Sequence, residues 1–428
     1  MMPHALAQAV EIATTALAVA GMGYFLASLV AAQVFLHERQ TRRAEFAPGV
    51  TADRSSSAGW RPGVSILKSL KGLDPGMMDA FRSHCRQKYA GEFELLFGVA
   101  SRDDPAAAAV EGLQAEFPEQ TIRLIECPQQ LGTNGKVSTL VQLAVHAQHD
   151  FLLINDSDVT VSPRYLERVM CCFASPPFPH KEAERMGQRA PRDVGKPRPP
   201  VGLVTALYRG RTHGTLPSRL EALGIASEFI PGVLLSKLIE GGLHYGLGST
   251  LAVRREALEK AGGLMPLVDY LADDYELGAR VAKAGYRVEV SAEVVETSVP
   301  AYGWRGFLDH QLRWLRTVRC SRPWGYVGLI VTHGLGWALV NVLASGFSLV
   351  SLWLLGLSFF LRLAQAMAVG AAVLGDHDVL ANLWLLPVRD AIAMGLWVAS
   401  FAGETVVWRG ERFTLRQGKL HKISNENN

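Results

Sequence analysis

The stretch Phe151 to Val159, FLLINDSDV, decides the fold that we expect. A short apolar run typical of a buried strand stops at Asn155, and two carboxylates follow at Asp156 and Asp158. Because side chains in an extended segment alternate with period two, both carboxylates point the same way. Oxygen-only ligation of this kind suits Mg²⁺ or Mn²⁺ carrying a diphosphate. A solvated turn after a strand uses the same residue types, so the interpretation depends on the rest of the chain.

Strands and helices alternate ahead of this stretch. Val64 to Lys68 and Phe93 to Val99 predict buried strands, and Pro75 to Tyr89 between them predicts a helix. A third strand is expected at Thr121 to Ile125, before a helix at Val137 to Ala147. The alternation predicts an α/β domain with a parallel sheet and right-handed crossovers. Such sheets bind ligands at the carboxyl ends of their strands.

Two of the following loops carry candidate binding residues. Asp103 and Asp104 precede Pro105, which is positioned to start a helix. A carboxylate there caps the helix or accepts hydrogen bonds from a base or ribose, and the two roles are compatible. In the loop Leu131 to Lys136, glycine lets backbone amides approach a phosphate and the lysine adds charge near a helix N-terminus.

A second acidic cluster consists of Asp273, Asp274 and Glu276, at the start of a helix predicted at Tyr275 to Ala284. One carboxylate is enough to cap this helix. Crowded like charges raise one another's proton affinity, as a general base requires. The cluster therefore predicts a base, with Asp273 and Asp274 both left as candidates.

The segments between the two acidic motifs differ in character. Val201 to Leu207 and Gly246 to Val253 predict strands, and the glycines of the second allow a ligand close to the backbone. Leu216 to Leu243 is apolar and belongs either to a soluble core or to a route for a lipid acceptor. The proline-rich stretch Ser175 to Pro200, after a helix at Pro163 to Phe173, predicts a flexible insertion.

Ala13 to Leu36 contains no charge and is long enough to cross the roughly 30 Å hydrocarbon core of a membrane. No Lys or Arg precedes it, which favours an uncleaved anchor over a signal peptide. The basic cluster His37 to Arg43 assigns the following region to the cytoplasm.

Three more apolar stretches follow the soluble part, at Val327 to Phe347, Leu349 to Leu374 and Leu380 to Phe401. Three spans would leave the basic C-terminus outside, so either one stretch is re-entrant or interfacial, or the C-terminus is exported. Arg389 and Asp390 mark the last stretch as the irregular one, because a charged pair inside a membrane needs a partner or water.

The basic and cysteine residues indicate which classes of ligand the chain binds. Trp304 to Arg319 mixes apolar residues with four arginines and a histidine, which predicts an interfacial amphipathic helix. The five cysteines show no metal spacing and indicate reduced thiols. The net charge is only +3, and the basic residues lie beside apolar segments. This favours lipid headgroups and nucleotide phosphates over nucleic acid.

These residues also resemble a known signature. In chain order Asp104, Asp156/Asp158, Asp273/Asp274 and His310-x-x-Arg313-Trp314 resemble the D, DxD, D, (Q/R)xxRW pattern of family 2-like inverting glycosyltransferases. More closely, the chain is similar to the ceramide glucosyltransferase family, glycosyltransferase family 21. The matching segments are GVSILKSLKGLDPG (63 to 76), DDPA (103 to 106), NGKVSTL (134 to 140), DSDVTVSP (156 to 163), GLVTALYRG (202 to 210), AGGLMPLVDYLADDY (261 to 275) and HQLRW (310 to 314). LADDYELG, VVETSV and HQLRWLRT look most similar to bacterial hopanoid-biosynthesis glycosyltransferases.

The resemblance implies a GT-A α/β fold, a UDP-sugar donor and a divalent metal, Mg²⁺ or Mn²⁺. Asp104 would hold the uridine, and Asp156 and Asp158 the sugar and the metal. The donor-binding candidates also include the matched positions Lys68, Asn134 and Lys136.

For catalysis, the resemblance implies that Asp274, next to Asp273, deprotonates a lipid hydroxyl. Arg313 and Trp314 would stabilise the leaving UDP and shape the acceptor end. His310 stands where animal members carry Arg or Gln, and DSD replaces their DSG, which favours metal binding by Asp158.

The expected plan has six parts: an N-terminal anchor (1–43), a linker (44–60), a cytoplasmic GT-A domain (61–302), an interfacial helix (303–325), C-terminal transmembrane helices (326–405) and a basic cytoplasmic tail (406–428). The expected reaction adds N-acetylglucosamine to a hopanoid, bacteriohopanetetrol, at a bacterial inner membrane; the alternative makes glucosylceramide. A processive polysaccharide synthase would need more spans. A lipid-binding protein without activity would not need the strand-end carboxylates.

Overall fold

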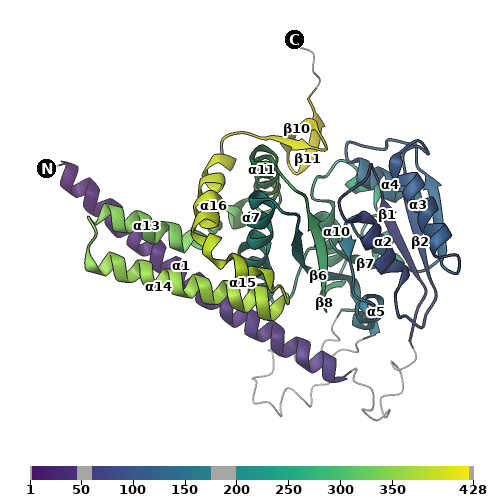
Figure 1. The fold of residues 1–428 in the computed structure, drawn as a ribbon, viewed down its shortest axis with the longest axis horizontal. Helices are drawn as coiled ribbons and strands as arrows, with labels where there is room; N and C mark the ends of the chain where they lie inside the picture. Colours follow the sequence, from purple (N-terminus) through teal and green to yellow (C-terminus); the bar gives the residue numbers. More distant parts are fainter. Residues whose placement is uncertain (1, 46–59, 175–198, 424–428) are drawn as a thin grey trace.

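The computed structural model describes residues 2–45, 60–174 and 199–423. The linker predicted at 44–60 and the insertion predicted at 175–200 therefore lie almost entirely outside the described residues. The described chain forms an α/β sheet domain, a set of long apolar helices and a small C-terminal sheet (Figure 1).

The centre of the α/β domain is an eight-stranded sheet within the described residues, in the order β3-β2-β1-β4-β7-β6-β8-β5. Its strands are β1 (Val64–Ser69), β2 (Phe93–Val99), β3 (Thr121–Glu126), β4 (Phe151–Ile154), β5 (Val159–Thr160), β6 (Val201–Thr212), β7 (Leu251–Arg254) and β8 (Arg287–Val299). The helices of this domain are α2 (Met77–Cys85), α3 (Pro105–Glu116), α4 (Gly135–Ala144), α5 (Tyr165–Ala174), α9 (Arg255–Lys260), the 3₁₀ turn η2 (Met265–Leu267) and α10 (Asp273–Lys283).

The sheet is mixed, which corrects the prediction of a parallel sheet. β1 pairs in parallel with β2 and β4, whereas β7 runs antiparallel to both β4 and β6. The strand predicted at Gly246 to Val253 was wrong in its first half, because β7 begins only at Leu251. Apolar patterning marks a buried strand but carries no information on its direction.

The direction of the strands brings the sequence motifs to one edge of the sheet. β1, β2 and β4 are parallel neighbours, so the loops after Ser69, Val99 and Ile154 meet there. β7 is antiparallel and starts at the same edge, where Leu251 pairs with Ile154. The buried core beneath this edge includes Phe81 from α2 and Phe97 from β2, whose rings lie 4.7 Å apart.

Five apolar segments of the described chain are long enough to cross a membrane: Ala5–Thr41, Leu216–Glu240, Pro323–Ala344, Leu349–Val373 and Asp378–Ser400. The first lies within α1 (Met2–Glu45), and the second consists of α7 (Leu216–Gly224), the π-helical η1 (Ile225–Phe229) and α8 (Ile230–Glu240). The other three contain α12 (Pro323–Gly328), η3 (Leu329–His333), α13 (Gly334–Ala344), α14 (Leu349–Met367), η4 (Ala368–Val373), α15 (Asp378–Asn382), η5 (Leu383–Leu385) and α16 (Leu386–Ser400).

These helices fall into two groups. α13 and α14 lie along the N-terminal part of α1 (Figure 1), and Asn341 of α13 donates to Thr15 Oγ1 of α1 over 2.7 Å. α16 runs across that direction and packs against α7 and against α11 (Trp304–Ser321). The apolar segment predicted at Leu216 to Leu243 contacts both β6 and α1, so it joins the sheet domain to the helices.

The segment predicted as a tail is folded through Lys422. β9 (Thr405–Trp408), β10 (Glu411–Arg416) and β11 (Lys419–Lys422) form an antiparallel sheet with the order β11-β10-β9. It packs on Leu271 through Val406, Phe413, Leu415 and Leu420. The basic C-terminal segment therefore lies beside the sheet domain, near α11 (Figure 1).

Candidate active site

One lysine links the two acidic motifs. Lys136, in the first turn of α4, places Nζ 2.8 Å from Asp156 Oδ1 and 3.2 Å from Asp273 Oδ2. Burial alone would lower the pKa of Lys136, but Asp156 and Asp273 hold it above its ordinary value. Lys136 therefore forms ion pairs with one of the predicted strand-end carboxylates and with one carboxylate of the predicted base cluster.

Asp274 differs from its neighbour Asp273. Burial, together with the charge of Asp273, raises the pKa of Asp274 to about 6. A Cβ at Gly248 would lie 3.0 Å from Asp274 Oδ2 and 3.6 Å from Asp156 Oδ2, so Gly248 lies close to both carboxylates and a side chain there would crowd Asp274. Asp273, unlike Asp274, forms an ion pair with Lys136 among the described residues.

Asp158 is held by the last residues of β8. Its Oδ2 accepts hydrogen bonds from Thr297 Oγ1 (2.7 Å) and from the Ser298 backbone N–H (3.1 Å). Burial and the charge of Asp156 raise the pKa of Asp158 to about 6. Within the described residues no group of three or more His, Cys, Asp or Glu side chains is arranged to hold a metal. Two crowded carboxylates nevertheless fit a divalent cation whose other ligands are diphosphate oxygens and water.

Two of the residues predicted to bind the donor are buried. Lys68 is fully buried and donates to the backbone oxygen of Asp156 over 3.0 Å, and burial lowers its pKa to about 7. Asn134 is also buried; its Oδ1 caps α4 at Val137, and its Nδ2 donates to Tyr270 O over 2.7 Å. Both side chains therefore hold the loops of the site in place.

Asp104 serves as the predicted helix cap and also borders a cavity. Its carboxylate accepts from the backbone N–H groups of Ala106 and Gly72, each over 2.9 Å. The cavity has a volume of about 820 Å³, within the range of small-molecule sites. Its lining includes Asp104, His310 and Arg313, so the structure brings these three predicted residues together.

Trp314 has a different place from its two motif partners. Its ring lies 5.0 Å from His310 and 6.0 Å from Phe229, between α11 and η1. It is not among the residues that line the described cavities. Trp314 therefore supports His310 from the side of the apolar helices.

The cavity also has lining residues that the sequence analysis did not single out. Asp74 and Tyr302 belong to it, and so do Trp408 and Arg409 of the C-terminal sheet. Asp74 accepts a 2.5 Å hydrogen bond from Ser157 Oγ, between the two metal-site candidates. The sequence does contain a signal that predicts the C-terminal sheet. Residues that favour strands flank Arg-Gly and Gln-Gly turns in TVVWRGERFTLRQGKL.

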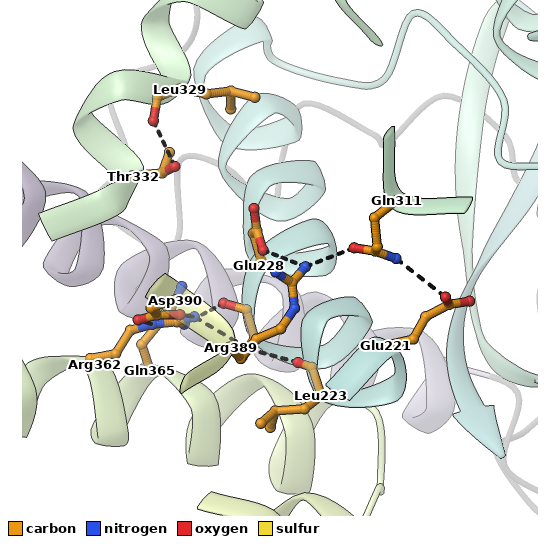
Figure 2. A network of polar contacts seen from close by, with 11 residues as sticks. Glu221, Leu223, Glu228, Gln311, Leu329, Thr332, Arg362, Gln365, Arg389 and Asp390 are labelled. Carbon is orange, nitrogen blue, oxygen red and sulfur yellow. Dashed lines mark hydrogen bonds and ion pairs between the residues drawn. The ribbon is translucent and has the colours of Figure 1, made fainter. Parts of the chain in front are cut away.

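A buried polar network extends from Glu221 and Gln311 into the apolar helices (Figure 2). Glu221 of α7 accepts from His310 Nδ1 (2.9 Å) and from Gln311 Nε2 (3.3 Å). Gln311 in turn accepts from Arg389 (3.1 Å), which pairs with Glu228 at 2.8 Å. Arg389 and Asp390 were expected to need a partner or water, and partners are present, because Asp390 pairs with Arg362.

The Glu221 contact predicts a role for a residue outside the motifs. A hydrogen bond at one ring nitrogen of a histidine sets its tautomer and orientation. Loss of an orienting partner of this kind costs about 10- to 100-fold in comparable sites. We expect Glu221→Ala to lower kcat to that extent and Glu221→Gln, which keeps an acceptor oxygen, to lower it less. Steady-state kinetics on folded variants test this, and equal kcat values for Ala and wild type would contradict it.

The fold and site define a class. A GT-A-like α/β domain carries acidic motifs at its strand ends and is joined to long apolar helices, the arrangement of a membrane-bound nucleotide-sugar glycosyltransferase. The chain belongs to Glycosyl transferase family 21, whose model matches residues 14–178 and 194–421.

Named relatives are ceramide glucosyltransferases. Ceramide glucosyltransferase 3 of Caenorhabditis elegans is 26% identical over 60% of this chain, and ceramide glucosyltransferase 1 is 23% identical over 83%. The chain spans 50% of the length of the first and 72% of the second. Among solved structures, the mannosyltransferase PcManGT from Pyrobaculum calidifontis matches with a TM-score of 0.42 and 18% identity, over 90% of this chain and 99% of the other.

Proposed function

We propose that this protein transfers a hexose from a UDP-sugar to the hydroxyl of a membrane lipid, with inversion, and that glucose and ceramide are the pair to test first. The observation that carries the proposal is Asp274, a carboxylate of raised pKa that faces Asp156 across Gly248. A base next to a diphosphate-metal motif is what glycosyl transfer to an alcohol requires.

The choice of ceramide rests on relatives. Those named above are ceramide glucosyltransferases, and further ones occur in yeasts and a filamentous fungus. These relatives support ceramide, the alternative acceptor, over the hopanoid that we expected first. No contact among the described residues distinguishes the two lipids.

In the proposed mechanism each side chain has one role. Asp274 accepts the proton as the lipid oxygen attacks the anomeric carbon, and the bond from that carbon to the UDP oxygen breaks on the opposite face. Lys136 keeps Asp156 and Asp273 compensated at 2.8 and 3.2 Å. Arg313, which lines the cavity with Asp104, balances charge on the departing UDP.

Asp156 and Asp158 would hold the divalent metal, which neutralises charge on the diphosphate when bound. We expect EDTA to weaken UDP binding by at least about tenfold, comparable to the loss of a metal-site partner, and Mn²⁺ to restore it. Asp158→Asn should bind UDP equally with and without Mn²⁺. Calorimetry tests both, and a variant that still responds to Mn²⁺ would move the metal away from Asp158.

We also propose an orientation. The sheet domain and the C-terminal sheet lie together, so both belong on the cytoplasmic side that the basic cluster at the C-terminal end of α1 indicates. α16 runs across α1, α13 and α14, which supports an interfacial or re-entrant last stretch and not an exported C-terminus. Cysteine labelling in sealed vesicles, at positions 3 and 425, tests this: only position 3 should react from the outside.

The function is tested with detergent-purified protein, UDP-glucose or UDP-N-acetylglucosamine, and ceramide or bacteriohopanetetrol in all four combinations. Lipid mass spectrometry identifies the products. A glucosylceramide supports the proposal. An N-acetylglucosaminyl hopanoid would replace it with the other acceptor, and the absence of any glycolipid with all four pairs would contradict both.

A further inference from the structure

The C-terminal sheet closes one side of the large cavity. Val407 and Trp408 of β9, and Arg409 and Gly410 of the turn before β10, line it together with Asp104 and residues of α11. A second cavity of about 190 Å³ lies between α11 and β9, bordered by Arg313, Arg316 and Arg412. Cations from two distant parts of the chain therefore converge on one space.

The two arginines of the large cavity lie near carboxylates but are not directly paired with them: Asp74, Asp104 and Asp309 line the same cavity. Among the described residues neither Arg313 nor Arg409 forms an ion pair. Arg409 has only a long 3.4 Å hydrogen bond to the backbone oxygen of Lys71. Burial lowers the pKa of Arg313 and the charge of Arg409 adds to this, while the charges of Glu221 and Asp156 act in the opposite direction. Facing arginines of this kind are typical of a site for an anion, because the guanidinium group matches phosphate geometry.

The backbone at Arg409 is unusual for an arginine. Arg409 and Gly410 have φ values of 49° and 82°, which is the conformation of a two-residue type I′ hairpin turn. This turn prefers Asn-Gly, and a long side chain at positive φ is uncommon. A residue that is unfavourable for the turn therefore occupies the tip that borders the cavity.

The sheet is firmly attached to both catalytic segments. Leu271, two residues before Asp273, donates its N–H to Gly418 O over 3.1 Å, and Leu420 donates to Asp269 O over 2.8 Å. On the other side, Arg319 of α11 donates to Gly403 O over 2.8 Å. The small sheet is thus anchored to both the base cluster and the HxxRW helix, and its hairpin tip contacts the sheet domain through the bond from Arg409 to Lys71.

We propose that the C-terminal sheet is part of the donor site and that Arg409 binds the diphosphate of a nucleoside diphosphate, facing Arg313. The inference rests on the proposed function, since a UDP-sugar supplies that diphosphate. It assigns a ligand-binding role to a segment that its composition alone marks as a basic tail.

Arg409→Asn separates binding from folding. Asn-Gly is the preferred pair for this turn, so the variant should unfold at the same temperature as wild type or higher. Loss of one charge-assisted contact should weaken UDP binding by about 10- to 100-fold. Uridine, which has no phosphate, should bind both proteins within about twofold. Arg416→Gln is the matched control, because Arg416 belongs to the same sheet but its side chain is 72% exposed and pairs with Glu404.

Calorimetry with UDP and uridine on the wild type and the two variants tests whether Arg409 binds the diphosphate. Equal UDP affinity in Arg409→Asn and wild type would overturn the inference. So would an equal loss for UDP and uridine, or an equal loss in Arg416→Gln. If the wild type binds no UDP at all, the proposed function itself fails. The two failures are therefore distinguishable.

Discussion

Asp274→Asn is expected to lower kcat by about 10²- to 10⁴-fold, the usual contribution of a general base, while UDP binds with nearly unchanged affinity. The amide has almost the same shape and can still accept from the Tyr275 N–H, but it cannot accept a proton from the lipid hydroxyl. Product formation is measured by lipid mass spectrometry, and UDP affinity by calorimetry. Retention of more than a tenth of the wild-type kcat would contradict the assignment.

Glu276 provides the matched control for this variant. It lies in the same first turn of α10 but pairs with Arg280 at 3.4 Å, one helical turn further along. Glu276→Gln removes one charge from the same helix end without touching the proposed base. We expect its kcat to stay within about twofold of wild type, as for a surface pair of small energetic effect.

Asp274 also predicts how kcat/KM depends on pH. The pKa of Asp274 is raised to about 6, so below pH 6 the group is protonated and cannot act as a base. The value of kcat/KM should therefore fall about tenfold per pH unit below 6 and level off above it. A profile that rises toward acid would contradict a base role. Because the pKa of Asp158 is also raised to about 6, Asp274→Asn should make the fall below pH 6 shallower and not abolish it.

Asp390→Ala is expected to have the largest effect on stability. Asp390 Oδ1 and Oδ2 accept from Arg362 over 2.6 and 2.8 Å, and both residues are buried among apolar helices (Figure 2). Removing one partner of a buried pair leaves an uncompensated charge, which costs about 3–5 kcal/mol. We expect a lower thermal midpoint and a smaller monodisperse fraction after detergent extraction.

The control for this variant removes both charges. In Arg362→Leu/Asp390→Leu no isolated charge remains, and apolar replacement of buried pairs is often neutral or stabilising. The double variant should therefore recover much of the thermal midpoint that Asp390→Ala loses. If Asp390→Ala melts like the wild type, the pair does not hold α14 against α16.

Several local features were predictable because they depend on neighbours in the chain. Asp104 caps α3 as expected, since an Asp followed by Pro at the first helical position is a strong start signal. β1 and β2 were expected at Val64 to Lys68 and Phe93 to Val99, and they match closely. The partnered state of Arg389 and Asp390 followed from the cost of a bare charge among apolar side chains.

Other features depend on contacts between distant segments. The antiparallel direction of β7 results from the path of α7, η1 and α8, and alternating apolar residues do not encode it. Lys68 and Asn134 matched a family pattern, but only packing shows that both are buried supports. The C-terminal sheet carries hairpin signals in its sequence, yet its place at the cavity depends on Leu271 and α11.

The sequence by itself determined the chemical groups of this protein: strand-end carboxylates, a basic amphipathic helix and apolar segments of membrane length. These are local properties, set by residue type and spacing. Only the tertiary structure decided which groups meet. It pairs Asp273 with Lys136, leaves Asp274 facing Asp156, and brings Arg409 to Arg313. The reason is physical, because such distances depend on strand order and packing across more than a hundred residues of chain, which no local pattern specifies.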